Sequence, residues 1–172
     1  MATRTKTIGA KGAPRSQLPA EMDPASPDYD VFKSPFFLMA RAISKYQQDL
    51  EVVMERMGSD RTIYRLMTIL LQVRRGGIKR ICEDAMLKLP TGSRAVERMR
   101  AKGWINSETS QTDARETEIE LTSAGTRVAL ELRKATSLQL YRAVDGLSTE
   151  QIKQMAACLQ QLSDNLSRLP IE

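Results

Sequence analysis

Apolar residues recur every three or four positions between residues 36 and 57, which is the spacing of one face of a helix. They are Phe36, Met39, Ile43, Tyr46, Leu50, Val53 and Met57. Ser34 and Pro35 precede them as favourable first residues of a helix, and Gly58 follows as a stop. A pattern sustained over successive heptads predicts a helix whose apolar seam packs along another helix.

The same spacing returns near the C-terminus. The apolar residues there are Ile152, Met155, Leu159, Leu162, Leu166 and Leu169. Ser148 and Gln151 stand before them at capping-box spacing, which indicates a helix start. Another helix is expected from the cap Thr122 to about Val144, ending before Gly146. Two copies of the chain that meet at these seams would form a symmetric dimer, whereas in a monomer the seams would pack on each other.

A helix-turn-helix pattern lies between the two seams. A second helix is predicted after Asp60, and Gly76 and Gly77 are expected to supply the left-handed turn that ends it. Its apolar stripe consists of Ile63, Leu66, Met67, Leu70 and Leu71. A short third helix is predicted to contain Ile78, Ile81, Ala85 and Met86.

The segment from residue 89 to 103 separates into two faces at helical spacing. One face has Gly92, Val96, Met99 and Gly103, and the opposite face has Thr91, Arg94 and Arg98. Leu89 and Pro90 interrupt the chain just before it, because a residue that precedes proline avoids the helical region. The first face is expected to pack, and the second is left to touch an acidic partner.

Two extended segments follow this helix. The first opens at Trp104 and Ile105, and in the second, residues 117–121, glutamates alternate with less polar side chains as in a half-buried strand. The polar residues between them form a turn, so a two-stranded wing is predicted. The fold class is therefore mainly α with a small β-wing: a winged helix-turn-helix module at 59–121, a dimerisation helix at 34–58, and C-terminal helices at 122–172 that complete the dimerisation region.

Residues 1–33 differ in composition from the rest of the chain. Thr, Ala, Gly, Pro and Ser dominate, and four basic side chains precede the first acid, Glu21. We predict a flexible, basic and Pro-rich arm. Its alternative roles are a solvated tail, a source of phosphate contacts, or a segment that packs on a partner subunit.

Basic side chains are concentrated in residues 74–102. That part carries 9 basic and 3 acidic side chains, against 10 and 8 in residues 1–73 and 7 and 10 in residues 103–172. Its local charge is +6 within an overall net charge of +5. The excess coincides with the predicted two-faced helix and the segment before it, as expected of a nucleic-acid-binding element.

Several classes of site are excluded by residue usage. The chain has no histidine, and its two cysteines, Cys82 and Cys158, are far apart without metal-ligand spacing, so neither a metal nor a cofactor is predicted. The commonest general base is missing, so we expect no catalytic residues and no enzyme. No stretch approaches a membrane span, and a cytoplasmic protein without a membrane partner is expected.

Four runs of residues in the chain resemble a family of bacterial transcription regulators. The runs SRAVERMRAKGWI, DAR, ELTSAG and GLSTEQIKQMAACLQQL, in this order, are similar to the MarR (multiple antibiotic resistance regulator) family. The order of elements fits from about residue 34 to residue 169 and leaves only the N-terminal arm uncovered. Each run alone is a weak signal, and the combination is specific.

The resemblance implies a winged-helix homodimer that binds a pseudo-palindromic operator in double-stranded DNA. Mapped by motif, the DNA-binding residues are Thr91, Ser93, Arg94 and Arg98 on the groove helix and Arg115 on the wing, with Asp113 placed to hold the wing arginine. The wing also carries several acids besides Asp113: Glu108, Glu116, Glu118 and Glu120. A wing that favours DNA must therefore aim Arg115 inward and its glutamates away.

The resemblance also implies a repressor released by a small effector, often aromatic or phenolic. Tyr46, Tyr64 and Met67 are candidate wall residues of an effector site, and ordinary core packing is their alternative role. A second hypothesis is a thiol-based regulator that responds through Cys82 or Cys158. A third is a helical protein-interaction module without sequence-specific DNA binding.

Overall fold

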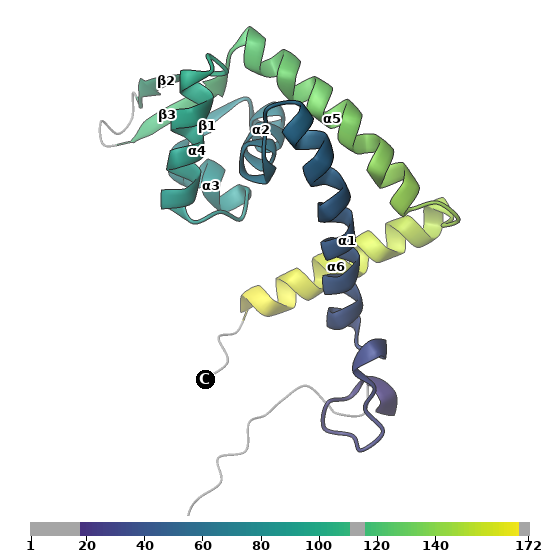
Figure 1. Cartoon of the computed structure of the whole chain (residues 1–172). Helices are drawn as coiled ribbons and strands as arrows, with labels where there is room; N and C mark the ends of the chain where they lie inside the picture. Colours follow the sequence, from purple (N-terminus) through teal and green to yellow (C-terminus); the bar gives the residue numbers. More distant parts are fainter. Residues whose placement is uncertain (1–17, 111–115, 169–172) are drawn as a thin grey trace, which may run out of the picture. The chain divides into compact units, whose positions relative to one another are not determined.

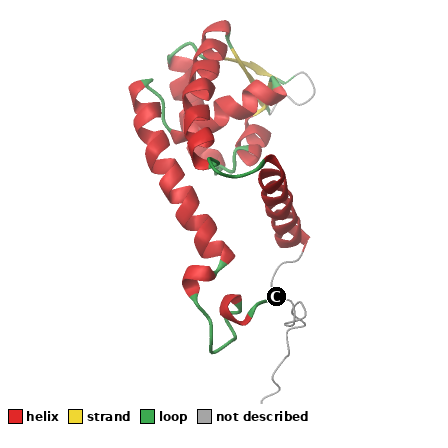
Figure 2. Cartoon of the chain, turned by 90° about the vertical axis from the view of Figure 1, so that its right-hand side faces the viewer, coloured by secondary structure: helices red, strands yellow, loops and turns green. Residues whose placement is uncertain are grey.

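The computed structural model describes residues 18–110 and 116–168. In these ranges the chain is mostly helical with one small sheet, as Figure 1 and Figure 2 show. The α-helices are α1 (Pro35–Arg56), α2 (Arg61–Val73), α3 (Ile78–Asp84), α4 (Leu89–Ala101), α5 (Ser123–Ala143) and α6 (Thr149–Arg168). The strands are β1 (Arg75–Gly77), β2 (Ile105–Thr109) and β3 (Thr117–Leu121). The predicted fold class, mainly α with a small β-wing, is confirmed.

The chain divides into one unit up to Lys45 and another from Tyr46 onward. In the first unit, residues 18–33 form two 3-10 helices, η2 (Ala20–Met22) and η3 (Val31–Lys33). The backbone N–H of Asp30 donates to the carbonyl of Glu21 at 2.9 Å, and its side chain accepts from the amide of Phe32 at 3.0 Å. The described part of the predicted flexible arm therefore has local structure.

The sheet has three antiparallel strands in the order β1-β3-β2. Strands β2 and β3 form the predicted two-stranded wing, and β1 is a third strand that the sequence did not predict. Strand β1 was hidden because the run Arg75–Gly77 shows no apolar alternation. Its glycines are not the left-handed residues that end α2; Arg74 takes that conformation, with φ of 69°. A Cβ at Gly77 in β1 would overlap the carboxylate of Glu116, which would have to shift.

The hydrophobic core lies in the second unit, where α2 is surrounded by the end of α1, by α3, α4 and α5, and by the sheet. Its buried members are Leu50, Met54, Ile63, Leu66, Met67, Leu70, Ile81, Cys82, Ala85, Ala95, Val96, Met99, Ile105, Ile119, Ala129 and Leu132. The placement of Met86 on the short third helix is wrong, because α3 ends at Asp84 and the Met86 side chain is 76% exposed. Its positive φ of 53° turns the chain so that Leu87 packs against the core in its place.

The C-terminal helices begin at the predicted caps. The hydroxyl of Thr122 accepts from the amide of Gly125 at 3.0 Å at the start of α5. Before α6, the Ser148 amide donates to the Gln151 side chain at 2.8 Å, and the Gln151 amide donates to the Ser148 hydroxyl at 3.2 Å. This reciprocal pair is the predicted capping box. No residue of α6 is buried, and its apolar seam is exposed at Met155, Leu159 and Leu166.

Candidate nucleic-acid interface

Helices α3 and α4 form the helix-turn-helix pair, and α4 has the two faces predicted from its spacing. Gly92, Ala95, Val96 and Met99 are buried, whereas Thr91 and Arg94 are exposed. Ser93 is half-buried between the two faces, and Arg98 is exposed one turn beyond Arg94. The exposed face of α4 therefore presents hydroxyl and guanidinium groups, which are the groups that bond base edges and phosphates.

The buried face of α4 lies close to α3 because of Gly92. A Cβ at this position would overlap Sγ of Cys82, which is 1% exposed. An isolated glycine inside a helix normally costs about 1 kcal/mol relative to alanine. Here the missing side chain lets the two helices approach, and α4 starts at Leu89 with Pro90 in its first turn.

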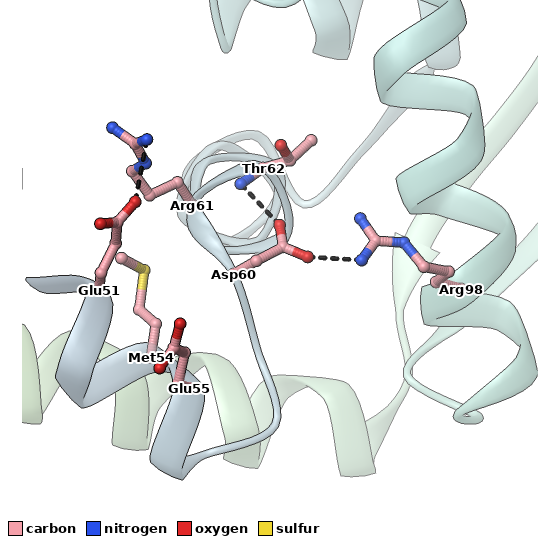
Figure 3. Close-up of a pocket in the computed structure, with 7 residues that line it drawn as sticks. All are labelled: Glu51, Met54, Glu55, Asp60, Arg61, Thr62 and Arg98. Atoms are coloured by element: carbon pink, nitrogen blue, oxygen red, sulfur yellow. Dashed lines mark hydrogen bonds and ion pairs between the residues drawn. The ribbon is translucent and has the colours of Figure 1, made fainter.

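Arg98 is held by an acid of the same chain. Its Nη1 lies 2.5 Å from Oδ2 of Asp60, the N-cap of α2, as Figure 3 shows. The other oxygen of Asp60 accepts from the amides of Thr62 at 2.8 Å and Ile63 at 3.0 Å. Burial alone would raise the pKa of Asp60, but the Ile63 amide and the Arg98 guanidinium outweigh it and lower that pKa below its ordinary value. One carboxylate thus caps α2 and holds α4.

Lys102, just past the end of α4, makes a second contact to the same turn. Its Nζ donates to the carbonyl of Gly58 at 2.6 Å and lies 4.6 Å from the ring centroid of Trp104. We call the contacts of Arg98 and Lys102 with Gly58 and Asp60 the α4 anchor. The anchor holds the C-terminal half of α4 and does not contact the polar side chains of its N-terminal half.

The remaining basic side chains of residues 74–102 differ in their availability. Arg75 and Arg80 lie within 4 Å of carboxylates, at 2.7 Å from Glu118 and 3.9 Å from Asp84. No ion pair is found in the described part of the chain for the others, which are Arg74, Lys79, Lys88, Arg94 and Arg100. All five are exposed. The local excess of positive charge is therefore available on the surface of the helix-turn-helix module.

Arg75 on β1 bridges the two strands of the wing. Its Nε donates to Oε2 of Glu118 on β3 at 2.7 Å, and its Nη2 lies 3.0 Å from Oε2 of Glu108 on β2. Hydrogen bonds from Glu118 and then Glu108 raise the pKa of Arg75 further above its ordinary value. The predicted wing contact Arg115 and its support Asp113 lie outside the described residues.

The predicted effector residues lie together at the core: Met67 is buried within it, and Tyr46 and Tyr64 pack against it. Met67 is 1% exposed, and the hydroxyl of the half-buried Tyr64 lies 3.1 Å from Oγ1 of Thr136 on α5. Burial and, after it, the neighbouring Tyr64 raise the pKa of Tyr46. Tyr46 and Tyr64 therefore lie close together at the edge of the core.

A cavity of about 290 Å³ lies beside the α4 anchor, and its walls are mostly charged. It is lined by Glu51, Met54, Glu55, Asp60, Arg61, Thr62 and Arg98, as Figure 3 shows. The three predicted effector residues are not among them. Two ion pairs cross this region, Arg98 with Asp60 and Arg61 with Glu51 at 2.9 Å.

The cysteines differ in environment. Cys82 is buried against Gly92, and burial followed by the Glu83 carboxylate raises the pKa of its thiol, which disfavours the reactive thiolate. Cys158 on α6 is exposed. In the described residues no cluster of potential ligands could hold a metal ion, and no helix there is long and apolar enough to cross a membrane.

Known proteins of similar sequence and structure share this architecture. No protein-family model matches the chain. The chain is 27% identical over 147 residues to the HTH-type transcriptional repressor IacR of Pseudomonas putida, covering 86% of this chain and 88% of IacR. It superposes on a MarR-family transcriptional regulator from Silicibacter pomeroyi with a TM-score of 0.73 and 22% identity, covering 83% of this chain and 94% of that one.

The chain has the winged-helix fold of the MarR family. The resemblance predicted from the sequence is thereby confirmed, and the proteins matched are regulators, not enzymes. A third match is a mutant of MarR from E. coli in complex with operator DNA, with a TM-score of 0.65 and 13% identity over 73% of this chain and 90% of that one. Within this MarR-type fold, α4 is the second helix of the helix-turn-helix and β2 and β3 form the wing.

Sequence reasoning missed three contacts that organise this MarR-type module. Asp60 and Arg98 are 38 positions apart, Gly58 and Lys102 are 44 apart, and Arg75 and Glu118 are 43 apart. No local pattern links residues at such separations. The one available signal was the run of two arginines and two glycines at residues 74–77.

Proposed function

We propose that this protein is a homodimeric transcription regulator that binds double-stranded DNA sequence-specifically, with α4 in the major groove. The observation that carries the proposal is the α4 surface, where exposed Thr91 and Arg94 lie opposite a fully buried face. The likeness to a repressor and to a protein complexed with operator DNA supports it. A helix held by its buried face and its anchor keeps its polar face rigid, as base recognition requires.

The proposed base contacts are made by the N-terminal half of α4. Arg94 can bond guanine with two hydrogen bonds, and Thr91 and Ser93 can bond base edges or phosphate. Arg98 uses one nitrogen for Asp60, and its other donors remain for a phosphate, since a guanidinium has five N–H groups. Arg115 remains our proposed minor-groove contact on the wing, with Asp113 as its support.

Dimerisation is proposed through the helices outside the helix-turn-helix module. Large apolar side chains are exposed on α5 and α6, including Leu138, Tyr141, Met155, Leu159 and Leu166. A monomer gains nothing from exposing these side chains to water, whereas a symmetric partner would bury them. A two-fold dimer also places two α4 helices on half-sites roughly 34 to 36 Å apart.

We also propose that the protein is a repressor and that a small effector releases it from DNA. The proposed site is the edge of the core at Tyr46 and Tyr64, where the Tyr64 hydroxyl contacts Thr136 on α5. An effector that displaces this contact would alter the packing of α2 against α5 and so the spacing of the two α4 helices. Such an effector must bind the released state more tightly than the DNA-bound state.

The experiment is selection of bound duplexes from random DNA, followed by titration of the selected duplex at several salt concentrations. We expect a palindrome with half-sites about ten base pairs apart. Arg94→Ala should weaken binding by roughly 10- to 100-fold, and it should lower the salt slope by about one if its contact is to a phosphate. Arg133→Ala, an exposed arginine on α5, is the matched control and should bind as the parent does. Recovery of no motif would refute sequence-specific binding and favour the helical interaction module.

A further inference from the structure

We propose that Arg75 is a positioning residue for DNA binding, which holds the two facing glutamates of the wing and halves their combined charge so that the wing can lie against the phosphate backbone. This inference rests on the proposed function. We call Arg75 with Glu108 and Glu118 the wing clamp. Its role differs from that of Arg94, because Arg75 acts through the wing and touches no nucleotide.

The wing clamp resolves a like-charge pair in the sheet. Glu108 on β2 and Glu118 on β3 are direct cross-strand partners in the antiparallel register. Carboxylates directly opposite each other destabilise a strand pair, because their Cβ atoms lie only about 5 Å apart. Arg75, whose own strand partner is Glu120, reaches across β3 and contacts both, at 2.7 Å from Glu118 and 3.0 Å from Glu108.

Other hydrogen bonds within the sheet hold Glu118 and its neighbour Glu120. The second oxygen of Glu118 accepts from the hydroxyl of Ser110 at 3.3 Å, so both of its oxygens have donors. The Asn106 amide donates to Glu120 at 3.4 Å. Glu108, Glu118 and Glu120 on the described strands therefore each accept a hydrogen bond from a donor within the sheet.

The wing clamp bears on DNA binding because of where these strands lead. Glu108 and Glu118 lie on the two strands whose connection carries the proposed contact Arg115. Two unpaired carboxylates at this point would repel phosphates within a Debye length, which is about 8 Å at physiological salt. Arg75 cancels one of these charges and spreads the other over a hydrogen-bonded cluster.

A purely structural role does not account for the wing clamp. The side chains of Arg75, Glu118 and Glu108 are 38%, 28% and 66% exposed, and ion pairs that remain open to solvent contribute little to the free energy of unfolding. The clamp should therefore matter more for affinity than for stability. This separation makes the proposal testable.

The test compares four proteins on the duplex selected for the parent: the parent, Arg75→Gln, Glu108→Gln with Glu118→Gln, and the triple variant. Arg75→Gln should weaken binding about tenfold at moderate salt, because it leaves two carboxylates unneutralised near phosphates. This loss of affinity should shrink as the salt concentration rises, because the repulsion between the carboxylates and the phosphates is screened. The triple variant should return to within about twofold of the parent, because the repelling charges are gone. Arg133→Gln is the matched control.

The double glutamine variant keeps the proposal falsifiable if Arg75→Gln misfolds. Glutamine still accepts hydrogen bonds from Arg75, so this variant should bind at least as tightly as the parent. Emission of the single tryptophan, Trp104, which precedes β2, reports whether the sheet is intact in each variant. Parent-like affinity of Arg75→Gln, a loss of affinity that does not shrink at high salt, or a triple variant as weak as Arg75→Gln would each overturn the clamp alone. A parent that selects no duplex overturns the proposed function and the clamp with it.

Discussion

Asp60 makes two separable contributions, and substitutions at this position can measure each one. One oxygen caps α2 by accepting from the amides of Thr62 and Ile63, and the other pairs with Arg98. Asp60→Ala removes both contributions. Asp60→Asn keeps an effective cap and removes only the charge, and Arg98→Gln removes only the ion pair.

The magnitudes follow from the geometry. Loss of a side-chain cap costs about 1 kcal/mol. The ion pair is short at 2.5 Å, but its side chains are 53% and 39% exposed, so we assign it about 0.5 kcal/mol after solvent screening. Asp60→Ala should lower the free energy of unfolding by about 1.5 kcal/mol, and Asp60→Asn and Arg98→Gln by about 0.5 kcal/mol each.

The assay is urea unfolding followed by far-ultraviolet circular dichroism at one fixed protein concentration, because dimer stability depends on concentration. Asp60→Asn combined with Arg98→Gln should cost no more than either alone, since both remove one shared interaction. Equal destabilisation by Asp60→Asn and Asp60→Ala would refute the capping role. Full additivity in the double variant would refute the ion pair.

Acid titration provides an independent check of Asp60. Its pKa is lowered in the folded protein, so its charge stabilises the fold above the ordinary aspartate value of 3.8. That stabilisation is lost as the pH falls through the lower folded pKa. The difference in unfolding free energy between the parent and Asp60→Asn should be constant near neutral pH and shrink below pH 3.8. A difference that grows on acidification contradicts this assignment.

Two further predictions concern the interface between α3 and α4 and its thiol. Gly92→Ala should destabilise the protein by about 1 to 2 kcal/mol in the same urea assay, because overpacking against Cys82 Sγ exceeds the gain in helix propensity. Adding Cys82→Ala should recover most of that loss, and no recovery would show that another contact is responsible. With a thiol-specific reagent, Cys82 should be modified only on unfolding, because Cys82 is buried and its pKa is raised. Rapid modification of Cys82 in the folded protein would restore it as a candidate redox sensor.

Local patterns in the sequence were sufficient to predict the helices and most of their starts. The start of α1 at Pro35, the cap of α2 at Asp60 and the capping box at Ser148 each involve residues within four positions of one another. The two faces of α4 follow likewise from a periodicity of three to four residues. Such features depend on backbone geometry that neighbouring residues impose, so they could be predicted before any tertiary contact was known.

The tertiary structure decided which polar residues are free and which are engaged. By spacing alone Arg94 and Arg98 look alike, yet Arg98 is held by Asp60, and no ion pair is found for Arg94 in the described part of the chain. The acidic wing looked unfavourable for DNA, and Arg75 on an unpredicted strand engages two of its glutamates. Long-range partners of this kind depend on how the elements pack, because residues some forty positions apart meet only after the chain has folded.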